Sequence, residues 1–263
     1  MTWLLLDAGN TALKWTLAEP GGLRAGAAGR LTPPDGCGDR LIAAVRAALA
    51  PGRQLQAALG CSVAADPVGE HLAAAVRQLL AGGVRWLASQ ARFEFDGVVL
   101  SNGYADAGRL GADRWHAMIA ARHASPGQPL LVVCAGTATT VDGIDAHGRF
   151  LGGVIAPGAG LMAESLARGT AKLPRSAGHY APMPDNTDDA IASGVLDAQA
   201  GLVERRARQM ARLGRRPRLV LAGGGALELA RHLRLDDQVE EVIVDEQLVL
   251  RGLWLRARCE LCS

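Results

Sequence analysis

The hydrophobic pattern opens with an unbroken apolar run at residues 3–6, which predicts a strand buried on both faces. The run ends in Asp7, and residues 9–11 (Gly-Asn-Thr) have the composition of a turn. Apolar and polar residues then alternate over 13–17, which is the period of a second strand. A P-loop needs a helix and a Gly-Lys-Ser/Thr ending at this point, so the pattern predicts strand, turn, strand instead.

The same pattern returns in the second half of the chain. Residues 130–133 form an apolar run, Cys134 takes the place of Asp7, and Gly136 takes the place of Gly9. Further strands are predicted over 139–144 and 150–155. We therefore expect an internal duplication.

Between these hairpins the pattern predicts alternating helices and strands. Helical spacing covers residues 41–49, 67–80, 115–122, 161–168, 188–213, 226–233 and 246–258. Short apolar runs predict strands over 56–61, 84–87, 98–100, 219–222 and 239–244. Residues 21–38 are expected to be short strand and loop, and residues 101–111 to be irregular. This order favours an α/β fold with mixed sheets.

The first turn carries candidate phosphate chemistry. A tight turn can aim backbone N–H groups at a phosphate. Asp7 could hold a hydrated magnesium ion, and Lys14 could pair with phosphate oxygens. The alternative is an ordinary hairpin with a solvated lysine.

Composition limits the remaining choices. The chain has 263 residues, 49% hydrophobic but only 4% aromatic, so Ala, Leu and Val must fill its core. A formal net charge of +2 gives no reason to expect nucleic acid or anionic membrane as a partner.

The 5 cysteines favour free thiols over a disulfide framework, and Cys259 with Cys262 lacks a second ligand pair for zinc. With no basic leader and no long apolar span, we expect a cytoplasmic protein.

Four short motifs resemble one known family. They are Asp-Ala-Gly-Asn-Thr-Ala-Leu-Lys at 7–14, Gly-Ala-Asp-Arg at 111–114, Gly-Thr-Ala-Thr at 136–139 and Asn-Thr at 186–187. In this order, over essentially the whole chain, they resemble the type III pantothenate kinases, also called the Bvg accessory factor family. The resemblance implies transfer of the ATP γ-phosphoryl group to pantothenate, the first step of coenzyme A synthesis.

The resemblance also implies an architecture and partners. It implies the acetate and sugar kinase/Hsp70/actin fold, with two ribonuclease H-like domains, expected here at residues 1–118 and 119–263, and ATP in the cleft. Magnesium is implied as a cofactor, together with potassium or ammonium. A homodimer is implied, with Thr187 supplied to the neighbouring subunit's substrate site.

Site residues follow from matching the motifs position by position. The implied ATP-binding residues are Asp7, Ala8, Gly9, Asn10, Thr11, Ala12, Leu13, Lys14, Thr137, Gly223 and Gly224. The implied pantothenate-binding residues are Tyr104, Gly111, Ala112, Asp113, Arg114 and Thr187, with Asp113 as general base. The residues alone also allow plainer roles: Asp113 or Thr187 as a helix N-cap, and Arg114 as a surface arginine.

Two positions depart from the family pattern. The family usually has proline near Ala107, and its absence leaves the substrate loop less rigid. Cys134 stands where the family usually has an aspartate that binds a monovalent cation, so potassium or ammonium binding is doubtful here. Lys14 or Lys172 could then share the neutralisation of phosphate charge.

Two other functions compete with pantothenate phosphorylation. One is a different kinase or phosphatase of the same fold, such as a sugar kinase or exopolyphosphatase. The other is a regulatory module that binds nucleotide without turnover, against which the intact Asp7, Asp113, Arg114 and Thr187 argue.

Overall fold

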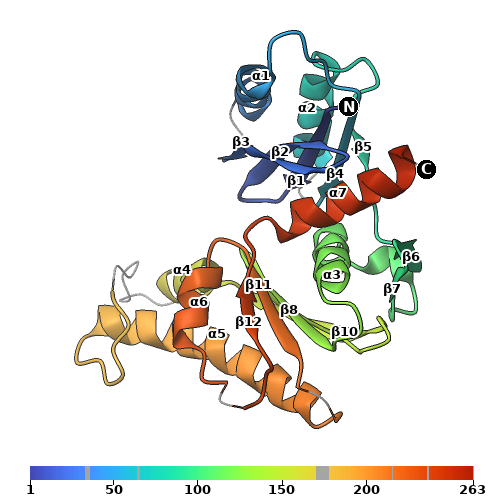
Figure 1. Cartoon of the computed structure of the whole chain (residues 1–263). Coiled ribbons are helices and arrows are strands. Elements are labelled where there is room, and N and C mark those ends of the chain that lie inside the picture. The colour runs from blue at the N-terminus through green and yellow to red at the C-terminus, as the bar shows by residue number, and fades with distance from the viewer. Residues whose placement is uncertain (33–35, 64–65, 170–177, 215, 236, 263) are drawn as a thin grey trace. The chain divides into compact units, whose positions relative to one another are not determined.

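The structure is a computed structural model that describes residues 1–32, 36–63, 66–169, 178–214, 216–235 and 237–262 (Figure 1). The chain divides into two compact units, Met1–Ala124 with Gln247–Ser263, and Ser125–Glu246. This division differs from the expected ranges, because a boundary at residue 118 falls inside a helix of the first unit. The C-terminal helix also belongs to the first unit.

The first unit is built on a five-stranded sheet of order β3-β2-β1-β4-β5. Its strands are β1 (Trp3–Ala8), β2 (Leu13–Glu19), β3 (Gly22–Leu31), β4 (Ala57–Ser62) and β5 (Arg85–Trp86). β2 pairs antiparallel with both β1 and β3, whereas β4 pairs parallel with β1 and β5. The apolar run of β1 is buried at every position, as a central strand requires.

The second unit repeats this topology. Its sheet has the order β10-β9-β8-β11-β12. The strands are β8 (Leu130–Ala135), β9 (Ala138–Ile144), β10 (Phe150–Pro157), β11 (Arg218–Ala222) and β12 (Val242–Val244). β9 pairs antiparallel with β8 and β10, and β11 pairs parallel with β8 and β12. The predicted duplication and the mixed sheets are therefore confirmed.

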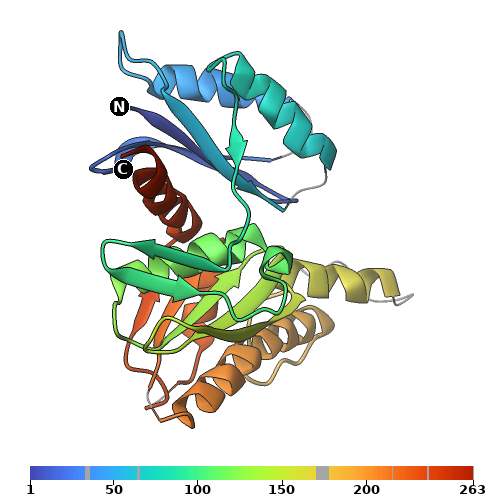
Figure 2. The same ribbon diagram turned by 90° about the vertical axis from the view of Figure 1, so that its right-hand side faces the viewer.

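Helices cover the sheets. The first unit contains α1 (Cys37–Ala48), α2 (Asp66–Arg77), α3 (Ala112–Ala124), α7 (Leu248–Leu261) and the short 3-10 helix η1 (Ala107–Arg109). The second unit contains α4 (Ala159–Gly169), α5 (Thr187–Ala211) and α6 (Ala226–His232). In the second unit, alternate residues of β8 and β11 share one core with α5 and α6, so both helices cover the same face of the sheet (Figure 2).

Strand alternation decides which face of the first sheet carries Asp7. Leu4, Leu6 and Ala8 pack with α1 and α2 in one core. Asp7 therefore faces the opposite side, where α7 packs on β1 and α3 packs on β4. α3 and α7 also lie side by side (Figure 1).

Three parts of the pattern prediction were wrong in detail. Residues 21–38 hold the ten-residue strand β3, and α1 already begins at Cys37. The strand expected over 239–244 is confined to β12, since residues 239–241 adopt no regular strand structure. β6 (Arg92–Phe95), which pairs with β7 (Val98–Ser101), was missed because its Arg and Glu interrupt the apolar pattern.

Candidate active site

Asp7 lies at the carboxyl end of the central strand β1. Its antiparallel neighbour across the hairpin is Lys14, and its parallel neighbour on β4 is Cys61. Residues opposite each other in a sheet point to the same face, so an ammonium group and a thiol flank the carboxylate. The carboxyl ends of parallel strands are where α/β sheets place ligands.

Burial makes Asp7 an unusually weak acid. Its side chain is 9% exposed, and loss of hydration raises its pKa from 3.8 to about 6. Lys14 lowers this pKa and Asp113 raises it, while the Cys61 thiol donates a hydrogen bond to Asp7 Oδ1 at 3.8 Å. Asp113 therefore lies close enough to Asp7 for its charge to raise the pKa of Asp7.

The first turn is closed by the amide of Gly9, which donates to the carbonyl oxygen of Ala12 at 3.0 Å. That amide is therefore used inside the turn and not for a phosphate. Asn10 and Thr11 are exposed at the tip, with Ala12 half-buried and Leu13 buried. This leaves the exposed tip and Lys14 as the groups of this turn that the predicted phosphate site could use.

Asp113 sits in the first turn of α3, not at its N-cap, because the helix already begins at Ala112. Its Oδ1 accepts the backbone N–H of Arg114 at 2.8 Å. Burial is the largest influence on Asp113 and raises its pKa, opposed by hydrogen bonds and by the Arg114 charge. A Cβ on Gly111 would lie 2.8 Å from Asp113 Oδ1, so glycine at 111 leaves this carboxylate its space.

Arg114 is not a surface residue, since its side chain is 4% exposed. Its Nη1 donates to the Tyr104 hydroxyl at 3.2 Å, and its guanidinium carbon lies 5.8 Å from the Tyr104 ring centroid. The structure thus brings together two residues that are ten positions apart in sequence. A buried guanidinium beside a hydroxyl is suited to binding a carboxylate.

The loop before α3 is held by side chains that sequence reasoning missed. The carbonyl oxygen of Ala107 accepts hydrogen bonds from Ser89 Oγ at 2.6 Å and Asn102 Nδ2 at 3.2 Å. Asn102 Oδ1 accepts the N–H of Tyr104 at 3.0 Å. These bonds hold the backbone at Ala107, where the absence of proline was expected to leave the loop less rigid. Polar residues scattered over 89–102 gave no periodic signal.

The second turn, like the first, is closed by the amide of its glycine, but it is one residue shorter. The amide of Gly136 donates to the carbonyl oxygen of Ala138 at 3.0 Å, and Thr137 is exposed. The glycine loop follows β11, the parallel neighbour of β8, and Gly223 has φ +97°. A Cβ on Gly223 would lie 2.3 Å from the oxygen of Ala135, and Gly224 is exposed. Thr137 and the glycine loop therefore both follow the carboxyl ends of neighbouring parallel strands, at one end of the second sheet.

Cys134 occupies the position in β8 that Asp7 occupies in β1. Its strand neighbours are Thr140 and Ala222, where Asp7 has Lys14 and Cys61. A thiol is a soft donor and does not suit an alkali cation, so this site does not fit potassium or ammonium as the family's aspartate would. Lys172 lies outside the described residues.

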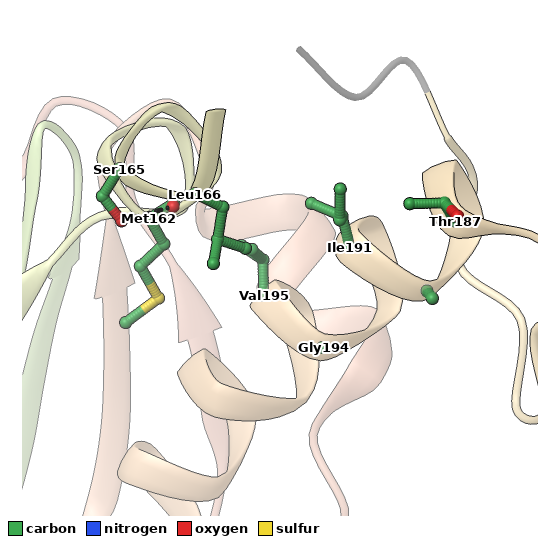
Figure 3. A pocket seen from close by; sticks show the side chains of 8 residues that line it. Met162, Ser165, Leu166, Thr187, Ile191, Gly194 and Val195 are labelled. Atoms are coloured by element: carbon green, nitrogen blue, oxygen red, sulfur yellow. Dashed lines mark hydrogen bonds between the residues drawn. The ribbon is translucent and has the colours of Figure 1, made fainter. Parts of the chain in front are cut away.

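Thr187 is the first residue of α5, and the helix cap is Asn186, whose Oδ1 accepts the N–H of Asp189 at 2.9 Å. Thr187 instead lines a groove of about 530 Å³ between α4 and α5 (Figure 3). We call it the α4–α5 groove; its other lining residues are Met162, Ser165, Leu166, Ala190, Ile191, Gly194 and Val195.

Among the described residues, a metal ion would have few protein ligands. In the described part of the chain no group of three or more His, Cys, Asp or Glu side chains could hold a metal ion. Magnesium keeps most of its water and is often bound through one carboxylate and substrate phosphates, so Asp7 fits a hydrated magnesium ion. Over the same residues, no helix has the length and apolar character to span a membrane.

Comparison with known proteins finds one family over most of the chain. The family model described as type III pantothenate kinase matches residues 3–209. A type III pantothenate kinase of Laribacter hongkongensis is 44% identical, covering 97% of this chain and 98% of the relative.

Solved structures show the fold. The (R)-2-hydroxyglutaryl-CoA dehydratase component A of Acidaminococcus fermentans has a TM-score of 0.54 at 16% identity. A ROK family protein of Streptococcus pneumoniae in complex with sucrose has a TM-score of 0.51 at 12% identity. Both matches cover 100% of each chain. The acetate and sugar kinase/Hsp70/actin fold is confirmed.

Proposed function

The chain belongs to the type III pantothenate kinase family, and from this premise we propose that Asp113 is the general base that activates pantothenate for phosphorylation by ATP. The enzyme transfers the γ-phosphoryl group of ATP to pantothenate, giving 4'-phosphopantothenate in coenzyme A biosynthesis. The observation that carries the residue assignment is that the Asp113 charge raises the pKa of Asp7, which places Asp113, on α3, close to Asp7 at the end of β1.

Asp113 has the properties of a base for this step. Its raised pKa makes the ionised carboxylate a stronger proton acceptor than an exposed aspartate, while its hydrogen bond from Arg114 fixes its direction. The hydroxyl proton of pantothenate passes to Asp113 as the oxygen–phosphorus bond forms. The bond from the γ-phosphorus to ADP breaks, and ADP leaves with that electron pair.

Arg114 and Tyr104 orient the acceptor. The guanidinium can bind the pantothenate carboxylate through two parallel hydrogen bonds. Tyr104 already accepts a bond from Arg114 Nη1, so it limits the orientations of the guanidinium. Both residues come from the segment that carries Asp113, which places acceptor binding next to proton abstraction.

Asp7, Lys14 and the two turns serve the nucleotide. Asp7 would hold magnesium through water, and magnesium when bound neutralises charge on the phosphate oxygens. Lys14 adds a second positive charge on the same sheet face. Thr137 and the glycine loop at 223–224 would contact ATP from the second unit. Because ATP is the donor, we place the reaction in the cytoplasm.

An assay of ADP release tests the function directly. Release should depend on pantothenate and not on a panel of hexoses or on polyphosphate, since Arg114 selects a carboxylate. Hexose-dependent release would favour a sugar kinase, which the shared fold allows. Nucleotide binding without any release would favour a regulatory module.

The α4–α5 groove supports a homodimer. Leu166, which lines the groove, is 38% exposed; Leu161, also on α4, and Ile155, on the preceding strand β10, lie outside its lining and are 42% and 63% exposed. Apolar surface of this kind is typical of subunit interfaces. Thr187 lies in the same groove, so a second subunit seated there would bring its own site close to this residue.

Mixing two inactive variants tests the shared site. Asp113→Asn and Thr187→Arg subunits are each expected to be inactive as homodimers. A mixed dimer would hold one site with both native residues, so a statistical mixture should recover about a quarter of native activity. Subunit exchange followed by the ADP assay measures this. The matched control is the double variant that carries both Asp113→Asn and Thr187→Arg, taken through the same exchange alone, which should stay inactive. Verified mixed dimers without recovery would show that each subunit builds its own site.

Cys134 predicts the response to potassium. The native enzyme should show weak or absent activation, because a neutral thiol replaces the aspartate that binds the cation in the family. Cys134→Asp should gain several-fold potassium activation if the rest of the cation site persists. Turnover is measured in potassium-free buffer and over a potassium titration, with Cys134→Ser as the neutral control. Strong, saturable potassium dependence of the native enzyme would contradict this prediction.

A further inference from the structure

The junction between β10 and α4 presses against the second phosphate turn. The amide of Gly158 donates to the carbonyl oxygen of Thr137 at 2.9 Å. A Cβ on Gly158 would lie 2.1 Å from the oxygen of Gly136 and 2.7 Å from that of Thr137, so backbone touches backbone here. The position of Thr137 therefore follows the position of the Pro157–Gly158 peptide.

One buried side chain on α5 donates a hydrogen bond to that peptide. Gln199 is 3% exposed, and its Nε2 donates to the carbonyl oxygen of Pro157 at 2.9 Å. The same nitrogen lies 3.2 Å from Met162 Sδ, so each of its two N–H groups has an acceptor. The amide of Met162 in turn donates to the carbonyl oxygen of Gly158 at 2.9 Å, closing the first turn of α4.

We propose that Gln199 is a positioning residue for the second phosphate turn: through Pro157 and Gly158 it fixes Thr137 where the phosphates of a nucleoside triphosphate bind. The proposal rests on the proposed function, in which Thr137 contacts ATP. Gln199 does not touch the nucleotide; it acts through the Pro157–Gly158 peptide. Nothing in the sequence motifs pointed to it, because it lies on a helix twelve residues after Asn-Thr at 186–187.

The arrangement has a clear physical consequence. The carbonyl oxygen of Pro157 is bonded to the buried side chain of Gln199, so Pro157 would shift toward another partner if Gln199 could no longer donate. Since Gly158 leaves no gap against Gly136 and Thr137, that shift must move the turn. A displacement of a binding group by about 1 Å can lower catalytic efficiency by about 10²-fold.

Gln199→Leu removes both donors at similar volume. We expect kcat/KM for ATP and the affinity for magnesium–ADP, measured by calorimetry, to fall by about 10- to 100-fold. The KM for pantothenate at saturating ATP should stay within about twofold, because Tyr104 and Arg114 belong to the first unit and Thr187 lies twelve residues before Gln199 on α5. Gln209→Leu is the matched control, since Gln209 is an exposed glutamine on the same helix.

Gln199→Glu adds a second measurement, the pH dependence of its ATP efficiency, which would not change if Gln199 had a purely structural role. A buried carboxyl facing a carbonyl oxygen and a thioether should have a raised pKa, and only its protonated form can donate to Pro157. Relative to the native enzyme at each pH, its ATP efficiency should be near native at low pH and fall as pH rises. If Gln199→Leu does not fold, this pH series decides the question.

Three outcomes are distinguishable. Native-like ADP affinity and ATP efficiency in folded Gln199→Leu, or a pH-independent ratio for Gln199→Glu, would overturn the positioning role. Equal losses for ATP and pantothenate would also overturn it, in favour of general destabilisation. Failure of the native protein to release ADP with pantothenate would overturn the proposed function instead, and the ADP affinities of the variants would still test Gln199.

Discussion

Replacing Asp113 by asparagine is expected to lower turnover by about 10²- to 10⁴-fold, the usual worth of a positioned general base. Asparagine has the same shape and can still accept the N–H of Arg114, so α3 should begin as it does in the native protein. It cannot accept the hydroxyl proton of pantothenate. The KM values should change much less than kcat, which steady-state ADP release measures.

The matched control is Asp39→Asn. Asp39 is an exposed aspartate in the first turn of α1, so this variant repeats the loss of one negative charge near a helix start. It should keep native turnover. Near-native turnover of Asp113→Asn would assign proton transfer to another group, and a large fall in Asp39→Asn would point to a general electrostatic effect.

The repeated hairpins allowed the fold to be predicted from the sequence. An apolar strand, a glycine turn and a second strand occur at 3–17 and again at 130–144, and each becomes the same part of the same sheet order. The placement of α7 in the first unit was not predictable from this pattern. It depends on packing between segments over a hundred residues apart, such as Gly252, where a Cβ would meet the His116 backbone at 1.9 Å.

The site was predictable where chemistry is concentrated in short motifs. Asp7, Asp113 and Arg114 were all singled out, and the structure adds the burial that raises the pKa of both acids. Cys61 was missed because it lies in an apolar strand and reaches Asp7 only through strand pairing. Side chains that act through the backbone, such as Asn102, leave no periodic or motif signal at all.

Asp7→Asn is expected to abolish most activity while making the protein more stable. The folded protein holds Asp7 with a pKa raised from 3.8 to about 6, so its ionisation opposes folding. That cost is absent below about pH 3.8, develops as pH rises, and is complete above about pH 6, where it amounts to about 3 kcal/mol. Asparagine carries no charge and does not incur it.

The stability difference between Asp7→Asn and the native enzyme should therefore grow with pH. Denaturant unfolding at pH 5 and pH 8 measures it, with Asp39→Asn as a control that should change the free energy of unfolding by less than about 1 kcal/mol at either pH. The native enzyme's kcat/KM should fall as pH drops through about 6, because protonated Asp7 cannot hold magnesium. A buried acid retained against its own cost to stability is typical of a functional group. Lower stability of Asp7→Asn at pH 8 would show instead that the ionised carboxylate stabilises the fold through Lys14 and Cys61.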